Sequence, residues 1–448
     1  MKDERELVPF DPSKGKVSNI VDALEAAAHL SQTVEPPAWL DGTAPGPPRE
    51  FVAMQNGLLR ISTRELIPHT PAFFNEYALP FAYDPTAPKP RRWHQFTDEL
   101  WRDDENSIST LAEIMGYIIG GGTAQQKLFL FVGPKRAGKG TIIRVLTALL
   151  GPENVAAPTL SSLAQNFGLQ PLVGKPLAAI ADARLGTRSD ATVAVERLLS
   201  ISGEDTITID RKYKDPWTGR LPTRFVLLTN ELPRLTDASG TIASRFVILV
   251  LTNSSYGKEN PALTDELVGE APGIFNWALE GLDRLNQRGH FVQPEVSGNA
   301  LRQLEDLASP VSAFVRDRCR IGPNLVVDKD ALWKAWRTWC DDEGARAGTK
   351  SVFVRDLRAA YPKALPQRPA LPDGRRVHVI AGIALADENA IEPTPDTPDQ
   401  RRLHPVSGQS GQGWQGSSPL FSDGAVGLTD EDEIERLAQL ARREQDTT

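Results

Sequence analysis

A chain of 448 residues, with 40% hydrophobic and 24% charged side chains, has the composition of a soluble globular protein with roughly two to four domains. The formal net charge of -8 argues against a surface that is basic throughout, although a few basic loops can still bind nucleic acid. Two cysteines, Cys319 and Cys340, exclude a disulfide framework and a multi-cysteine zinc cluster. We expect a cytoplasmic protein, because there is no signal-peptide core and no apolar run near the ~20 residues that span a membrane.

The N-terminal part divides into two segments. Residues 1–50 begin with a predicted helix, Val17–Leu30, and continue into a linker rich in proline and glycine. Residues 51–126 are typical of a small α+β module: an apolar strand, the turn Asn56-Gly57, proline-punctuated loops and a closing helix over Ser107–Ile119. In residues 127–288 short apolar runs then alternate with helical segments, which predicts an α/β domain around a parallel sheet.

Residues 289–385 comprise a helical linker and a small domain. The small domain has three predicted helices and a strand pair: Val311–Cys319, Lys329–Asp342, Val352–Ala360 and the pair around Arg376–Ile383. This order indicates a winged-helix-like fold that contacts DNA. The alternative is a helical packing or oligomerisation module. Residues 386–448 are predicted to be disordered, with a helix over Thr429–Glu444 that is either part of a solvated tail or a docking helix for a partner.

A glycine-rich loop is the most informative motif. The apolar strand Leu128–Val132 precedes a loop, Gly133–Gly138, with the spacing G-x-x-x-x-G-K, and an amphipathic helix follows. Glycines allow backbone N–H groups to face phosphate oxygens, the helix N-terminus adds partial positive charge, and the lysine reaches the β- and γ-phosphates. The motif predicts a P-loop that binds ATP and Mg²⁺ through Gly133, Gly138, Lys139, Gly140 and Thr141.

The residue after the lysine is Gly140, where serine or threonine is usual. The hydroxyl that binds magnesium is therefore displaced to Thr141. The same glycine-lysine-glycine-threonine order occurs in adenylate kinases, so a small-molecule nucleotide kinase stays an alternative.

Acidic residues follow the next apolar strand. Asp182 ends the strand that begins at Pro176, and an acid in this position either holds Mg²⁺ or its water, or caps a helix. Glu196, Glu204 and Asp205 lie downstream as candidates for the general base.

A basic hairpin is predicted between residues 206 and 229. Thr206–Ile209 alternates like a strand, Asp215–Gly219 has turn chemistry, and Phe225–Thr229 is an apolar strand. The hairpin carries cations interleaved with Tyr213 and Trp217, namely Arg211, Lys212, Lys214 and Arg220. Such a hairpin suits the backbone of single-stranded DNA, or is a charged face in solvent.

Two polar residues follow in the α/β segment. Asn230 ends the strand Arg224–Thr229, where its amide can position the water that attacks a γ-phosphate. Arg245 lies between a loop and the buried strand Phe246–Leu251, either as an ordinary surface residue or as a residue that acts across a subunit boundary.

The order of these parts resembles a superfamily 3 helicase of the phage/plasmid replicative primase-helicase family. The resemblance includes residues 56–93, similar to the small domain that precedes the motor, and residues 272–285 beyond it. It implies an AAA+-like P-loop ATPase that assembles as a homo-oligomeric, hexameric ring and moves 3′→5′ on single-stranded DNA. It also implies residue roles: Lys139 and Thr141 in nucleotide binding, Asp182 as the Walker B acid, Asn230 as sensor, Arg245 as finger, and Lys212 or Lys214 as the cation of the pore hairpin.

The chain departs from the family pattern in two places. Fewer than 130 residues precede the P-loop strand and there is no zinc-type cluster, so we expect a separate primase or polymerase to make primers. The region of Asp182 lacks paired acids, which leaves the general base open. A replication initiator or packaging factor with a regulatory ATPase stays an alternative to the helicase.

Overall fold

The structure is a computed structural model that describes residues 11–386, apart from 32–33, 43, 182, 184–187, 236, 238–239 and 371–374. Asp182 and the helix predicted over Thr429–Glu444 lie outside the described residues. Within the described ranges, no helix is both long enough and apolar enough to span a membrane.

The N-terminal part contains short strands, three α-helices and one short 3-10 helix. Its elements are α1 (Lys14–Ala27), β1 (Ala38–Trp39), η1 (Pro48–Glu50), β2 (Phe51–Met54), β3 (Gly57–Arg60), β4 (Leu66–Ile67), β5 (Phe73–Phe74), α2 (Arg91–Leu100) and α3 (Glu105–Ile119). Strands β2, β3 and β4 form an antiparallel sheet, with the predicted tight turn between β2 and β3 at residues 55–56. The sequence predicted α1 and α3, whereas the segment that forms α2 was predicted to be loop.

Helix α2 forms because its apolar residues recur at helical spacing and are buried. Trp93, Phe96 and Leu100 pack into the main apolar cluster. The carboxylate of Glu270 accepts from the backbone N–H groups of Arg92 (3.0 Å) and Trp93 (2.9 Å) and so caps the helix from a distant part of the chain. Because the capping residue lies 178 residues away in the sequence, the residues around the start of α2 give no indication of this cap.

The predicted parallel sheet is confirmed, with five strands in the order β12-β6-β11-β8-β7. All neighbouring pairs are parallel; the strands are β6 (Leu128–Val132), β7 (Val155–Ala156), β8 (Leu177–Ala181), β11 (Arg224–Thr229) and β12 (Phe246–Val250). From β6 the chain passes to β7 at the far edge and later returns to β12 on the other side of β6. The strand order therefore reverses at β6, and in open α/β sheets such a point forms a crevice at the carboxyl ends of the strands.

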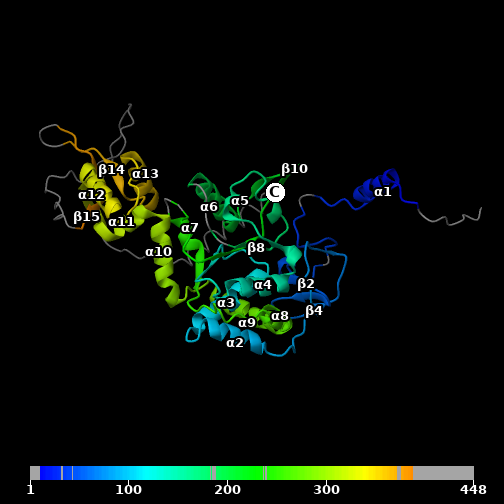
Figure 1. The fold of residues 1–448 in the computed structure, drawn as a ribbon. Helices are drawn as coiled ribbons and strands as arrows, with labels where there is room; N and C mark the ends of the chain where they lie inside the picture. Colours follow the sequence, from blue (N-terminus) through cyan, green and yellow to red (C-terminus); the bar gives the residue numbers. More distant parts are fainter. Residues whose placement is uncertain are drawn as a thin grey trace, which may run out of the picture. The chain divides into compact units, whose positions relative to one another are not determined.

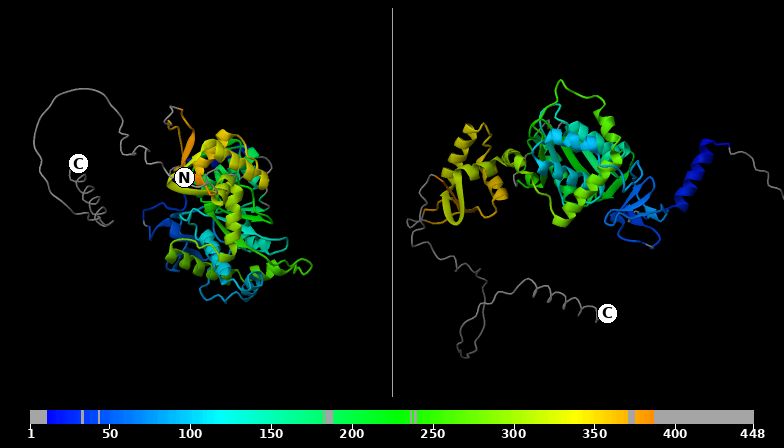
Figure 2. Two further views of the ribbon diagram at one scale, coloured as in Figure 1. Left: turned by 90° about the vertical axis from the view of Figure 1, so that its left-hand side faces the viewer. Right: turned by 90° about the horizontal axis from the view of Figure 1, so that it is seen from below.

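Helices cover both faces of this sheet (Figures 1 and 2). Phe129 and Phe131 face a layer that includes α3, α4 and α9, whereas Leu128 and Leu130 face a layer that includes α5, α6, α7 and α10. The helices of this part are α4 (Lys139–Leu150), η2 (Pro152–Asn154), α5 (Leu160–Leu163), η3 (Gln170–Leu172), α6 (Arg188–Ser202), α7 (Thr241–Arg245), α8 (Leu263–Val268), α9 (Ala271–Arg288), η4 (Glu295–Ser297) and α10 (Gly298–Ala308). The Phe129 cluster also includes Val52 and Leu59, so it crosses the domain boundary predicted at residue 126.

The basic hairpin exists, but its predicted turn was wrong. Strand β9 (Ile207–Arg211) pairs with β10 (Lys214–Gly219), and the turn is at Lys212-Tyr213. Asp215–Gly219, predicted as the turn, lies in the second strand with a register shift before Trp217. Strand β11, predicted as the partner strand, belongs instead to the five-stranded sheet.

The C-terminal described part has its own apolar cluster around stacked Trp336, Trp339 and Phe353. Its elements are α11 (Pro310–Arg318), β13 (Cys319–Asp328), α12 (Lys329–Asp342), α13 (Lys350–Ala360), β14 (Leu365–Gln367) and β15 (Val379–Leu385). The three helices lie where the sequence predicted them, and β15 pairs with both β13 and β14. Strand β13 was missed, and the winged-helix identity of this part stays a prediction.

Helices α3 and α9 pack closely under the sheet because glycines face the contact. A Cβ added to Gly116 of α3 would lie 2.2 Å from the carbonyl oxygen of Ala278 in α9. On the same pair of helices, Arg288 donates through both terminal nitrogens to the buried carboxylate of Glu113. This close contact holds the layer on which α4 rests.

We expect Gly116→Ala to lower the free energy of unfolding by about 1–3 kcal/mol, because the new methyl group meets backbone that cannot move aside. Gly298→Ala in α10 is the control, since no neighbour lies within 4 Å of its added Cβ and alanine favours helix by up to ~1 kcal/mol. Urea unfolding measures both. Equal stability of the two variants would contradict this packing.

Candidate functional site

The glycine-rich loop, residues Gly133–Gly138, connects β6 to α4 at the carboxyl edge of the sheet. Arg136 and Gly138 both adopt positive φ angles, 62° and 88°. Alternation of this kind turns successive N–H groups toward one side and creates a concave site for anions. Helix α4 begins directly afterwards, so the N–H groups of Lys139 and Gly140 lie at the same place without partners inside the helix, whereas the N–H of Thr141 donates to the carbonyl oxygen of Gly138 (2.9 Å).

Two glycines of the loop are required by close contacts. A Cβ on Gly133 would lie 2.2 Å from the carbonyl oxygen of Leu251, at the end of β12. A Cβ on Gly138 would lie 2.8 Å from Leu100 of α2, and the φ of this residue already favours glycine. The loop is therefore clamped between the adjacent strand and α2.

Lys139 brings the loop and a neighbouring strand together. Its ammonium group donates to the carbonyl oxygens of Gly133 and Pro134 (2.8 Å) and to Oδ1 of Asn230 (3.1 Å). The side chain is 9% exposed, and burial lowers its pKa. These three acceptors are neutral oxygens, so the positive charge is available to an anion placed on the loop.

Asn230 directly follows β11, which lies between β6 and β8. The parallel strands end at one edge, so the structure brings Lys139 and Asn230 together, as the sequence predicted for neighbouring strand ends. Asp182 follows Ala181, the last residue of β8, but itself lies outside the described residues.

Thr141 is buried near the start of α4, and its hydroxyl accepts a 3.0 Å hydrogen bond from Arg144 on the next turn. Arg144 also donates to Thr264 of α8 (3.0 Å). Sequence reasoning missed Arg144, although its spacing of three residues from Thr141 places the two on one helix face. A Cβ added to Gly140 would meet only the flexible end of the Arg144 side chain, at 3.4 Å.

Arg245 is not brought together with Lys139. It ends α7 just before β12, whose first residue pairs with Leu128 at the start of β6. The five residues of β6 separate the two edges of the sheet by ~16 Å. At its own edge Arg245 lies near Lys127, whose pKa is lowered by burial and by the charge of Arg245.

The other predicted residues lie away from the glycine-rich loop. Glu204, a candidate base, lies beyond the C-terminal end of α6 and accepts a hydrogen bond from the hydroxyl of Thr123. Glu196 lies within α6 and is exposed. Asp205 follows Glu204, and its N–H donates to Ser200. None of these three carboxylates contacts Lys139 in the part of the chain that the structure describes.

The hairpin presents charge at its tip. Tyr213 is 92% exposed, and the ammonium of Lys212 lies 5.1 Å from the centre of its ring. Lys214 is also exposed, whereas Arg211 donates back to the carbonyl oxygen of Asp215 (2.8 Å). Trp217 packs against the apolar cluster on the Leu128 and Leu130 face of the sheet, so its ring is not free to stack on a base.

Two family models match the chain. Residues 6–102 match a family described as "D5 N terminal like", and residues 131–245 match a "Family of unknown function (DUF5906)". The second match runs from the end of β6 to Arg245 and so includes Lys139, Asn230 and the hairpin. The first points to proteins of the phage replicative primase-helicase type.

Solved structures that resemble the chain include "The apo structure of NrS-1 C terminal region", with 14% identity and a TM-score of 0.49, covering 83% of this chain and 90% of that one. "The A form apo structure of NrS-1 C terminal region-CTR" has 14% identity, a TM-score of 0.46, and coverage of 83% and 91%. At these scores the likeness carries no argument about function.

We expect Gly138→Ala to lower the free energy of unfolding by at least ~1–2 kcal/mol, because a left-handed backbone disfavours a side chain and because its methyl group meets Leu100. Gly140→Ala, two residues on, is the matched variant and should be neutral or stabilising, since it lies in the helix with room for a methyl group. The midpoint of urea unfolding is the measurement; equal midpoints would contradict the loop geometry.

Proposed function

We propose that this protein is an ATP-dependent DNA helicase that moves on single-stranded DNA during replication of a phage, plasmid or similar mobile element. The observation that carries the proposal is the meeting of Lys139 with Asn230 inside a glycine-rich loop at the point where the strand order reverses. A cation, N–H groups and an amide oxygen then surround one position suited to a polyphosphate.

In the proposed mechanism, the N–H groups after Gly133 hold the phosphates of ATP, and Lys139 moves from the loop carbonyls to the β- and γ-phosphates. Asn230, released by the same movement, orients the attacking water. When bound, Mg²⁺ would neutralise charge on the β- and γ-oxygens. Thr141 and Asp182 are its proposed ligands, and Arg144 would have to leave the Thr141 hydroxyl for the metal to bind.

The position of Arg245 supports an assembly with shared sites. An arginine at the opposite edge of the sheet cannot serve the ATP of its own chain, but it can serve a neighbour in a ring. The mutual repulsion of Arg245 and Lys127 would be relieved by an anion such as a neighbour's γ-phosphate. We therefore propose a homo-oligomer, with a hexameric ring as the expected form.

The exposed tip of the hairpin supports contact with DNA. Lys212 and Lys214 provide cations for phosphates, and Tyr213 provides a ring on which a base can stack. Movement of this tip with the nucleotide state of the ring would pull a strand. The nucleotide kinase alternative gives no role to the hairpin.

ATP turnover tests the proposal. We expect hydrolysis to rise on addition of single-stranded DNA and to fall at least about 100-fold in Lys139→Ala, because preorganised charge of this kind contributes ~3 kcal/mol or more. Lys135→Ala removes an exposed lysine from the same loop and should keep wild-type turnover. A DNA-independent ATPase would favour the initiator or packaging alternative, and full activity of Lys139→Ala would refute the site.

Mixing two inactive proteins tests the shared site. Arg245→Ala should bind ATP nearly normally but hydrolyse it about 10³-fold more slowly, since arginine fingers contribute ~10³–10⁵ in rate. Combined with Lys139→Ala it should regain part of the activity, because some interfaces then pair an intact loop with an intact arginine. Proteins that co-assemble on a sizing column yet stay inactive in every proportion would contradict an arginine acting in trans.

A further inference from the structure

A second cavity, of about 170 Å³, is lined by several segments that are distant in sequence. Its lining includes residues from 34–37, 49–53 and 73–77 in the N-terminal part, from 120–123 after α3, from 173–176 before β8, Glu204, and residues from 217–224, which run from the end of β10 to the start of β11. Arg224 is the first residue of β11, so the cavity lies at the amino edge of the sheet. Lys139 and the glycine-rich loop are at the opposite edge.

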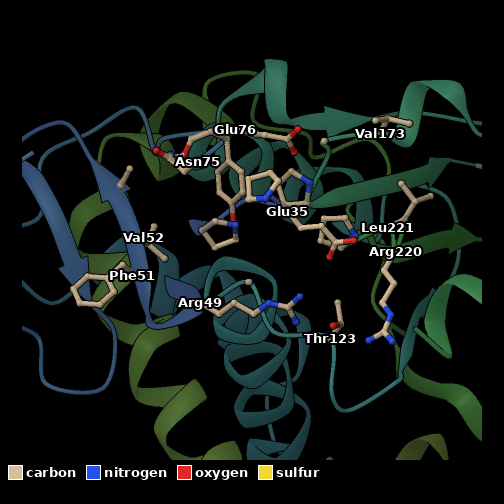
Figure 3. A pocket seen from close by; sticks show the side chains of 18 of the residues that line it. Glu35, Arg49, Phe51, Val52, Asn75, Glu76, Thr123, Val173, Arg220 and Leu221 are labelled. Carbon is tan, nitrogen blue, oxygen red and sulfur yellow. Dashed lines mark hydrogen bonds between the residues drawn. The ribbon is translucent and has the colours of Figure 1, made fainter. Parts of the chain in front are cut away.

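Two arginines approach this cavity from different sides (Figure 3). Arg49 comes from the N-terminal part and Arg220 from the segment after β10, and both side chains are exposed. Among the residues that the structure describes, neither guanidinium has a hydrogen-bond or ion-pair partner. Deeper in the wall, the buried Arg224 donates to the carbonyl oxygens of Ile118 and Pro222, while its Nε has no partner among the described residues.

Carboxylates line the same cavity. Glu35 and Glu76 face it in Figure 3, and Glu204 contributes the group that accepts from Thr123. Glu76 is exposed as a whole residue, although partial burial of its carboxyl group raises the pKa of that group. A simple anion would be repelled by these groups, so a matching ligand carries a negative charge for the arginines and N–H donors for the carboxylates.

A nucleotide within a DNA strand has this chemistry. The cavity is many times larger than the ~10–15 Å³ that one water molecule requires, so it has room for a planar base. The sugar and phosphate would then stay at the mouth, beside the exposed Arg49 and Arg220. Carboxylates accept from the N4 amino group of cytosine, whereas thymine offers a carbonyl oxygen at that position.

The hairpin leads directly to the cavity. Lys214 at its tip begins β10, and Arg220 at the mouth directly follows this strand, six residues or ~20 Å of extended chain away. Trp217 and Thr218, between them, already line the cavity. A strand bound at the tip would therefore pass the mouth.

We propose that the cavity accepts one unstacked base of the DNA strand held by the β9–β10 hairpin, with cytosine preferred over thymine. Arg49 and Arg220 bind the flanking phosphate, and Glu76 and Glu204 accept hydrogen bonds from the base. The proposal rests on the DNA binding proposed above and adds a subsite to it.

Fluorescence anisotropy with oligo(dC) and oligo(dT) of equal length tests the subsite. We expect wild type to bind oligo(dC) about tenfold more tightly, and Glu76→Ala to remove this preference, since a base contact of this kind discriminates between bases. Arg49→Ala and Arg220→Ala should each weaken both oligonucleotides and lower the log–log salt slope by about 0.7, the value for one lost phosphate contact on single strands. Melting temperatures should not change, because neither arginine has a partner to lose. Arg102→Ala, which removes an exposed arginine outside the cavity, is the control.

The outcomes separate the subsite from the helicase proposal. If wild type binds neither oligonucleotide, both proposals fail. If Lys212→Ala with Lys214→Ala abolishes binding while Arg49→Ala and Glu76→Ala match wild type, DNA binding stands and the subsite is refuted. If these cavity variants lose calorimetric binding of free dCMP but keep wild-type affinity for DNA, the cavity is a small-ligand site and the subsite is likewise refuted.

Discussion

The hydrogen bonds of one ammonium group unite the elements of the candidate active site. Lys139 donates both to its own loop and to Asn230 of the neighbouring strand, and this contact exists because β6 and β11 are adjacent and parallel. The layer of α3, α4 and α9 fixes β6 from one face. Leu251 and Leu100 confine the loop at either end. Displacement of any of these neighbours would separate the lysine from the amide.

The common direction of the five strands places different functional groups at the two edges of the sheet. All five strands run in one direction, so their carboxyl ends collect the glycine-rich loop and Asn230, while their amino ends collect Arg245, Lys127 and the second cavity. The candidate phosphate site at the carboxyl edge and the cations at the amino edge are complementary in charge, so they could meet between two copies of the chain placed side by side. The proposed ring and the proposed subsite for a base both follow from this division.

Periodicity and turn chemistry predicted the glycine-rich loop, the helices of the C-terminal part and four of the five strands of the sheet, because each of these signals is local; the two-residue strand β7 (Val155–Ala156) was missed. The hairpin turn was misplaced because Asp215–Gly219 has stronger turn chemistry than Lys212-Tyr213, yet Trp217 packs against the apolar cluster on the Leu128 and Leu130 face of the sheet. Helix α2 was missed because Glu270 supplies its cap. The cavity is lined by several segments that are distant in sequence, so no motif could have indicated it.

The contact of Arg224 with α3 has a consequence for the folding of the chain during its synthesis. Its guanidinium satisfies the carbonyl oxygen of Ile118, near the end of α3, 106 residues earlier. Ribosomes release the chain from the N-terminus, so α3 emerges long before this arginine and before α9, its main packing partner. Until then, the carbonyl oxygens at the C-terminal end of α3 accept hydrogen bonds from water, and the face of α3 that packs on α9 is exposed. During synthesis, α3 therefore completes its packing only after α9 has emerged.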